Sequence, residues 1–251
     1  MVILFYFITL HVKLLSMKRL LTFSFFFLAF LTCVAQSILV EYEQKVSEGN
    51  VVNYPDVWIT DSITTNLGKA GNLKETSFVK KKKEGFLYCT EMAQRKAFYV
   101  KDSLHNFRWI LTADTATILR HKCMSAKTFF RGRTYLAFYT PKIPISDGPW
   151  KFGGLPGLIL EAKSTDGYVI WRAIKLDLAY KGSFKYIDVS THTYIDWNTY
   201  IAQYKEQLDK FIHSLRSNKE ALSAGTKLKY KIPAIEVFHP VQLEGIDIVG
   251  E

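Results

Sequence analysis

A histidine two residues before a cysteine is the first pair of side chains that could do chemistry. His121 and Cys123 would point to the same face of a β-strand. A thiol with a histidine base in reach is the arrangement of a nucleophilic cysteine, so a hydrolase assembled around Cys123 and His121 is one hypothesis. Such side chains lie about 7 Å apart along a strand, too far for a direct hydrogen bond. The favoured interpretation is a structural cysteine beside a surface histidine.

Basic and aromatic side chains form a second candidate site. Arg131 and Arg133 precede a loop rich in proline and glycine, and Trp150, Lys151 and Phe152 lie inside it. Guanidinium and ammonium groups recognise anions, and aromatic rings bind apolar ligand surfaces. These five residues are the candidate ligand-binding set, for an anionic or hydrophobic ligand. The alternative is a basic rim that is simply solvated.

No spacing favours a metal ion or a cofactor. The histidines are scattered, and the sequence has no His-x-x-x-His and no Cys-x-x-Cys. The glycine-rich stretch 153–157 lacks a following Gly-Lys-Ser/Thr and leads into a strand-like run, which excludes a phosphate-binding loop. We therefore assign no metal, no cofactor and no catalytic residue from the sequence.

Two cysteines, Cys89 and Cys123, lie in predicted strands. In an oxidising compartment a disulfide between them could contribute ~3 kcal/mol through the unfolded state. Two buried free thiols would give the same pattern, so both alternatives stay open.

The N-terminal region predicts export. Residues 1–35 contain no Asp or Glu, and from Met17 a basic start leads into an apolar stretch and the small-residue site Cys33-Val34-Ala35. This pattern indicates a signal peptide over 17–35, with 1–16 as a start-codon overshoot and Gln36 as the mature N-terminus. The apolar run is shorter than the ~20 residues of a spanning helix, so we expect no transmembrane segment after cleavage.

Export changes the meaning of the positive charge. The 33 Lys and Arg residues outnumber the 23 Asp and Glu residues, which gives a formal charge of +10. An exported protein meets lipid head groups, polysaccharide or acidic peptides, so nucleic acid is not an expected partner. The expected location is periplasmic or extracellular, with outer-membrane association as a further option. An outer-membrane or envelope protein is the kind of partner that this location would supply.

Short alternating runs separated by turn residues predict the elements that position these side chains. We expect a single α+β domain over 36–251, mainly an antiparallel curved β-sheet or half-barrel with one amphipathic C-terminal helix packed on it. Residues 50–72 show no period and are expected to hold at most a short strand or helix. The expected strands are Ile38–Ser47, Gly85–Met92, Lys96–Lys101, Phe107–Thr112, Ala116–Lys127, Arg133–Tyr139, Leu158–Ser164 and Tyr168–Tyr180.

Turn signals and one change of period complete the pattern. Turns are expected at Ala113-Asp114 and Asp166-Gly167, and Lys80–Lys83 is expected to be a solvated turn. A helix is predicted over 196–216 with Asp196 as N-cap, and 225–251 is expected to be an extended tail. The apolar residues of the helix recur at every third or fourth position: Trp197, Ile201, Tyr204, Leu208, Phe211, Ile212 and Leu215.

The stretch from Thr140 to Asp166 holds four of the seven prolines and a crowd of glycines, which specifies a fixed backbone path. Within it lies the hexapeptide Gly154-Leu155-Pro156-Gly157-Leu158-Ile159. Through this hexapeptide and its context the chain resembles the GLPGLI family of secreted bacterial envelope proteins, over about 107–176. The resemblance implies an exported, envelope-associated protein of unestablished biochemical role, and it supplies no catalytic residues.

The hexapeptide is interpreted as structural. It predicts a tight turn with at least one glycine at positive φ, with Leu155 and Leu158 turned inward and Ile159 beginning a strand. Two functions follow from the sequence: a non-catalytic envelope binding or accessory protein, and the hydrolase at Cys123. A pocket lined by Tyr, Phe and Trp would favour binding, whereas convergent polar groups at Cys123 or His121 would favour the enzyme.

Overall fold

The computed structural model describes residues 37–47, 51–67, 78–94, 96–104, 107–182, 188–218, 225–230 and 235–249. The expected signal peptide and the residues before it lie outside the described residues. Ser37–Glu251 forms one compact unit. Within the described ranges, no helix is both long enough and apolar enough to cross a membrane.

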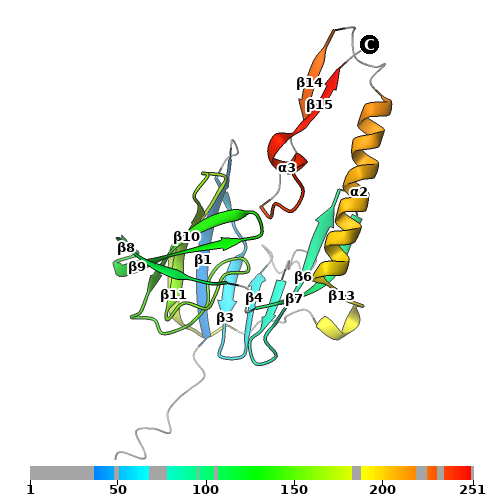
Figure 1. Cartoon of the computed structure of the whole chain (residues 1–251). Helices are drawn as coiled ribbons and strands as arrows, with labels where there is room; N and C mark the ends of the chain where they lie inside the picture. The colour runs from blue at the N-terminus through cyan, green and yellow to red at the C-terminus, as the bar shows by residue number, and fades with distance from the viewer. Residues whose placement is uncertain are drawn as a thin grey trace, which may run out of the picture. The chain divides into compact units, whose positions relative to one another are not determined.

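Antiparallel sheet dominates the described part of the chain (Figure 1). One sheet has thirteen strands in the order β13-β7-β6-β5-β4-β3-β1-β12-β11-β10-β9-β8, with β2 beside β1, and β13 is parallel to β7. The strands are β1 (Ser37–Val46), β2 (Val51–Asn53), β3 (Asp56–Ile59), β4 (Ile63–Leu67), β5 (Phe78–Lys81), β6 (Phe86–Ala93), β7 (Lys96–Ser103), β8 (Ile110–Ile118), β9 (His121–Phe130), β10 (Arg133–Thr140), β11 (Leu158–Ser164), β12 (Val169–Tyr180) and β13 (Ile195–Asp196).

A 3-10 turn at Val189–Thr191 precedes β13, and helix α2 (Trp197–Ser217) follows β13 directly. Asp196 caps it, because its carboxylate accepts a hydrogen bond from the Thr199 amide at 3.0 Å. The helix buries Tyr200, Tyr204 and Leu208 and contacts β6, β7 and β13, beside which it lies in Figure 1. The predicted fold class, α+β with a mainly antiparallel curved sheet and one amphipathic C-terminal helix, is confirmed.

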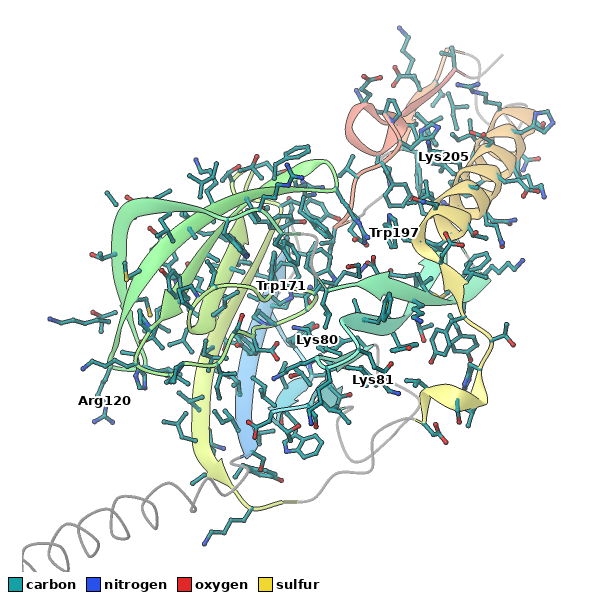
Figure 2. All side chains as sticks on the ribbon, turned by 60° about the horizontal axis from the view of Figure 1, so that its bottom comes forward. Lys80, Lys81, Arg120, Trp171, Trp197 and Lys205 are labelled. Carbon is teal, nitrogen blue, oxygen red and sulfur yellow. The ribbon has the colours of Figure 1, made fainter. Side chains whose placement is uncertain are left out.

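Several sequence predictions about the path of the chain are wrong. In the stretch expected to hold at most a short strand or helix, the described residues 51–67 form three short strands, β2 to β4. The turn expected at Ala113-Asp114 is an irregularity inside β8, and the chain reverses instead at Leu119 and Arg120, which both adopt positive φ. The single strand expected over Ala116–Lys127 is therefore wrong, because its residues are divided between β8 and β9. Figure 2 shows Arg120 at that tip. Paired positive φ values match the twist of a two-residue hairpin, which explains why the chain reverses there. Strand β8 pairs with β9 on both sides of Ala113-Asp114.

The tail predicted as extended folds back on itself. Strand β14 (Lys227–Tyr230) pairs with β15 (Ile246–Val249), and the short helix α3 (Val241–Glu244) precedes β15. Ile246 and Ile248 are buried, so this hairpin has an apolar face to cover. The segment between the two strands carries Glu236.

An aromatic cluster packs on one face of strands β9 to β12. Tyr135, Phe152 and Trp171 are 0% exposed. Trp150 stacks on Trp171 with ring centroids 5.3 Å apart, and Phe152 meets Trp171 edge-on at 5.5 Å. The proline-rich loop between β10 and β11 therefore supplies core side chains, in addition to linking two strands.

The Gly154–Ile159 hexapeptide forms the predicted turn. Gly154 has φ +86°, Leu155 and Leu158 are buried, and β11 begins at Leu158. The loop closes because the Leu158 amide donates to the Ile143 carbonyl at 3.0 Å and the Ile159 amide to the Asp147 carbonyl at 2.9 Å. Of the two glycines that bracket Leu155 and Pro156, only Gly154 has a positive φ.

Gly157 is required because the backbone of Thr140 leaves no room for a side chain. A Cβ atom at Gly157 would lie 2.3 Å from the carbonyl oxygen of Thr140. Backbone cannot move aside as a flexible side chain can, so we expect Gly157→Ala to lower the free energy of unfolding by about 1–3 kcal/mol, the scale of an overpacked interior. Gly153→Ala is the matched control, because its Cβ would meet nothing closer than 3.4 Å. Urea denaturation of the two variants measures the difference, and equal midpoints would contradict the steric explanation.

A buried lysine ties the same loop to the sheet. Lys80, expected in a solvated turn, is 2% exposed, because β5 extends through it and the turn begins later. Its ammonium group donates to Asp147 Oδ1 at 2.8 Å, to the Gly148 carbonyl at 3.0 Å and to the Phe152 carbonyl at 2.7 Å. Asp147 is also buried and accepts hydrogen bonds from Thr64 and the Gly148 amide, with Lys82 at 3.0 Å. Figure 2 shows Lys80 among the strands.

Candidate functional site

The basic cluster predicted from the sequence closes around a carboxylate of the same chain. The Lys151 ammonium lies 2.9 Å from Glu236 Oε2 and 2.7 Å from Glu91 Oε1. Arg131 donates to Glu236 at 2.6 Å and to both oxygens of Asp102 at 2.7 and 2.8 Å. All of these charged side chains are largely buried, Glu91 least with 21% of its side chain exposed, so the cluster is an internal ion network.

The backbone of the C-terminal segment is held by the same strands. Arg133 donates from Nε to the Ile235 carbonyl at 2.9 Å, and the Tyr135 hydroxyl donates to that carbonyl at 3.1 Å. Arg133 also pairs with Asp166. The Val237 amide donates to the Arg131 carbonyl at 2.8 Å. These contacts dock residues 235–237 against the turn between β9 and β10.

This arrangement gives most of the predicted ligand-binding set partners within the chain. Arg131, Arg133 and Lys151 are occupied by Glu236, Asp102, Asp166 and the backbone, and Phe152 is fully buried in the aromatic cluster. The sequence indicated an anion at this cluster, and the structure supplies one from the chain itself. Of the five candidates, Trp150 lines an open pocket.

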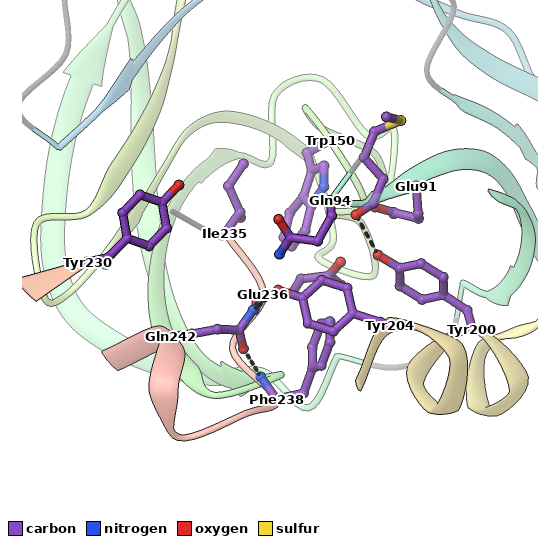
Figure 3. Close-up of a pocket in the computed structure, with 11 residues that line it drawn as sticks. Glu91, Gln94, Trp150, Tyr200, Tyr204, Tyr230, Ile235, Glu236, Phe238 and Gln242 are labelled. Carbon is purple, nitrogen blue, oxygen red and sulfur yellow. Dashed lines mark hydrogen bonds between the residues drawn. The ribbon is translucent and has the colours of Figure 1, made fainter. Parts of the chain in front are cut away.

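The pocket has a volume of about 350 Å³ and opens beside the ion network (Figure 3). Helix α2, the end of β6, the loop before β11 and the C-terminal segment each contribute side chains. Five of its residues are aromatic, and two carry carboxylates. The lining residues are Glu91, Met92, Gln94, Trp150, Tyr200, Tyr204, Tyr230, Ile235, Glu236, Phe238 and Gln242.

Hydrogen bonds fix the polar groups of the pocket wall. The Gln242 side-chain amide donates to the Tyr204 hydroxyl at 2.7 Å, and its carbonyl oxygen accepts from the Phe238 amide at 2.9 Å. The Tyr200 hydroxyl donates to the Met92 carbonyl at 3.2 Å. Figure 3 shows the last two bonds as dashed lines. The wall is therefore preorganised, because each of these side chains is held by another part of the chain.

Burial and charge shift the pKa values of the network in defined directions. Burial alone would lower the pKa of Lys151, but the carboxylates of Glu236 and Glu91 outweigh it and raise that pKa well above its usual value. Burial raises the pKa of Glu91; the nearby Glu236 carboxylate adds to this rise, and Lys151 opposes it. Lys151 thus stays charged, and Glu91 is the pocket carboxylate that burial makes easier to protonate.

The hydrolase hypothesis at Cys123 finds no support in the local geometry. The Cys123 thiol is buried, and its sulfur lies 3.4 Å from the backbone carbonyl of His121, to which it donates. Burial raises the pKa of this thiol, whereas an activated nucleophile needs a lowered one. Neither residue lines the pocket.

The disulfide alternative is also settled. Cys89 and Cys123 are both free and buried. Cys89 lies on β6 and Cys123 on β9, and the sheet order places β5, β4, β3, β1, β12, β11 and β10 between these strands. Burial raises the pKa of the Cys89 thiol well above its usual value, as expected for an inert core cysteine. In the described residues no group of three His, Cys, Asp or Glu side chains could hold a metal ion.

The fold and the pocket define a β-rich domain with a polar and aromatic cavity at one end of its sheet. The chain matches the family described as "N-glycanase peptide, N-terminal domain" over residues 50–201, and it belongs to that family. No curated protein matches the chain.

Two solved structures resemble the chain, both of PNGF-II, in the P21 and C2 space groups. Each is 19% identical and covers 69% of this chain, with TM-scores of 0.49 and 0.48. The matched parts are 34% and 33% of the two chains. This chain therefore spans about a third of the length of those proteins.

Sequence reasoning missed most of the pocket. Glu91 and Glu236 carry no motif and stand far apart in the sequence. Tyr200 and Tyr204 were detectable, since Tyr204 belongs to the predicted apolar stripe and Tyr200 is four residues before it on the same helix. Gln242 gave no signal, because it faces the pocket only after the C-terminal segment folds back.

Proposed function

We propose that the chain is an exported, non-catalytic binding protein of the bacterial cell envelope, and that its pocket takes a saccharide. The observation that carries the proposal is the pocket itself, where aromatic rings stand beside fixed amide, hydroxyl and carboxylate groups. The signal-peptide pattern and the GLPGLI resemblance support export. The family description, which names an N-glycanase, supports a glycan as the ligand class.

The chemistry of the lining suits a polyhydroxylated ligand with an apolar ring face. Trp150, Tyr230 and Phe238 offer rings for stacking, whereas Gln94 and Glu91 offer hydrogen-bonding groups. Glu236 is already shared by Lys151 and Arg131, so it is not a free acceptor. With Glu91 and Asp102 the ion network holds three carboxylates against two cations, which leaves a net negative charge beside the pocket. An anionic ligand, one of the two classes expected from the sequence, would face this charge and is disfavoured.

Binding is favoured over catalysis by the state of the nearby charged groups. Lys151 bridges Glu91 and Glu236, which supports a structural role for both carboxylates in one ion network. Cys123 is buried outside the pocket. The family description therefore supports a glycan as the ligand of this chain, and we propose no glycan-cleaving activity for it.

The test uses a free N-glycan and the corresponding glycopeptide as probes. Isothermal titration is expected to show saturable binding of the glycan. Tyr230→Ala should weaken it about tenfold, since Tyr230 is 39% exposed and lines the pocket. Tyr99→Ala is the matched control, because Tyr99 is 40% exposed and lies outside the pocket. Equal effects of the two substitutions, or no saturable binding, would refute the pocket assignment.

A cleavage assay with the same glycopeptide separates a binding protein from an enzyme. Mass spectrometry of the glycopeptide after incubation is expected to show no change in mass. A cleaved product that disappears in Glu91→Gln would establish an enzyme at this pocket and overturn the non-catalytic part of the proposal.

A further inference from the structure

The outer face of the sheet carries a row in which aliphatic and lysine side chains alternate from strand to strand. The pairing registers place these residues directly opposite one another across β8, β9, β10, β11, β12 and β1. Directly opposed residues of antiparallel strands point to the same face. The row consists, in strand order, of Ile110, Lys127, Leu136, Lys163, Ile170 and Lys45.

This face is the one opposite to the aromatic core. Tyr135, Ala162 and Trp171 are next to row residues in sequence, and all are 0% exposed because they point to the other side. In the row, Ile110 is 71% exposed and Lys127 and Lys45 are exposed, whereas Leu136, Lys163 and Ile170 are half-buried. Phe129, two residues from Lys127 on the same face, is also 71% exposed.

The charge of the face is positive. Lysines stand on every second strand, so at the usual strand spacing they are about 10 Å apart and the row is about 24 Å wide. Glu161 belongs to the neighbouring row, but it is buried and already bonded to Arg172 at 2.6 Å, with Lys163 at 3.4 Å. Glu43 lies opposite Arg172 in the same neighbouring row. The two rows together hold Lys45, Lys127, Lys163 and Arg172 against two carboxylates, so the face keeps a net positive charge.

We propose that this row, with Phe129, is a docking surface for an anionic lipid membrane. Apolar side chains exposed to this degree need a partner, and lysines between them fit a surface that offers both negative head groups and acyl chains. A second copy of the chain would set lysines against lysines. The N-terminal residues 1–35 are no better suited, because they contain no Asp or Glu and are themselves basic.

Vesicle co-sedimentation of the protein purified from exporting cells tests the proposal. The probes are phosphatidylcholine vesicles with and without phosphatidylglycerol. We expect binding only to the anionic vesicles, with loss of binding at high salt. Lys127→Gln with Lys163→Gln should weaken it about thirty-fold, from the contribution of each lysine near an anionic surface. Phe129→Ser should weaken it roughly tenfold.

A matched control carries the same charge change elsewhere. Lys205 and Lys227 are exposed on α2 and β14, and Lys205→Gln with Lys227→Gln should leave vesicle binding unchanged within about twofold. Equal losses in both pairs would show that net charge alone drives binding and would overturn the assigned face. Absence of binding to anionic vesicles would overturn it as well. A dimer in sedimentation equilibrium that the Lys127 and Lys163 substitutions abolish would make a second copy the occupant. All variants must keep the wild-type melting curve.

Discussion

Replacing Glu236 with alanine is expected to lower the free energy of unfolding by about 3–5 kcal/mol, because it leaves two buried cations without a shared partner. Lys151 is 5% exposed and would keep only Glu91 at hydrogen-bond distance, and Arg131 would keep Asp102. The docked segment 235–237 would then be held mainly by the bonds to the Ile235 carbonyl and the Arg131 carbonyl. Urea denaturation measures the loss, and hydrogen exchange should show the C-terminal segment opening first.

The control for this variant is Glu206→Ala. Glu206 pairs with Lys210 at 2.6 Å on the exposed side of α2, where ion pairs contribute little. We therefore expect no measurable shift of the urea midpoint in this variant. If the two alanine variants have equal midpoints, the buried network does not hold the C-terminal segment. Lys151→Ala should lower the free energy of unfolding by a similar amount, since it leaves the carboxylates of Glu91 and Glu236 without their shared cation.

Replacing Asp147 with alanine is expected to be equally damaging. It would leave the buried Lys80 ammonium with two carbonyl acceptors and no counter-charge, at a cost of about 3–5 kcal/mol. Because Lys80 binds the Gly148 and Phe152 carbonyls, the effect should spread to the whole loop before β11. Lys81→Ala is the control, since Lys81 pairs with Glu84 at the surface. A Lys80→Met, Asp147→Leu double variant should recover part of the loss.

The ion pairs of Asp147 also predict that the free energy of unfolding falls at acid pH. Burial alone would raise its pKa, but Lys80 and Lys82, with hydrogen bonds from Lys80 and Thr64, outweigh burial and lower it below 3.8. A lowered folded pKa means that this stabilisation is present above pH 3.8 and is lost as the pH falls through the folded value. Urea midpoints between pH 5 and about pH 2 should fall steeply in the wild type and less steeply in Asp147→Asn.

Local pattern was enough to predict most strands and the helix. The β11 boundaries, Leu158–Ser164, and the Asp196 cap follow from alternation, turn residues and a capping side chain, all of which act within a few residues. The failures have one physical origin. Residues 51–67 form strands because neighbouring strands pair with them, and the Ala113-Asp114 signal is overridden because β9 continues the ladder past it.

The candidate site depended even more on distant contacts. The sequence identified Arg131, Arg133 and Lys151 as anion-binding side chains, and their chemistry is as expected. Their anion could not be identified, because Glu236 is 85 residues from Lys151 and no local rule brings the two together. The pocket exists only where α2, β6 and the C-terminal segment meet.

The order of the sheet sets a condition on when the chain can fold. Strand β1 pairs with β12, so residues 37–46 wait for residues 169–180 before the middle of the sheet can form. If the chain is exported unfolded, β1 emerges first together with its neighbour β3, whereas its other neighbour β12 emerges only after β4 to β11. Contacts this distant in sequence are slow to form and leave strand edges open meanwhile. The emerging N-terminal strands should therefore need a chaperone that covers strand edges until Tyr180 has crossed the membrane.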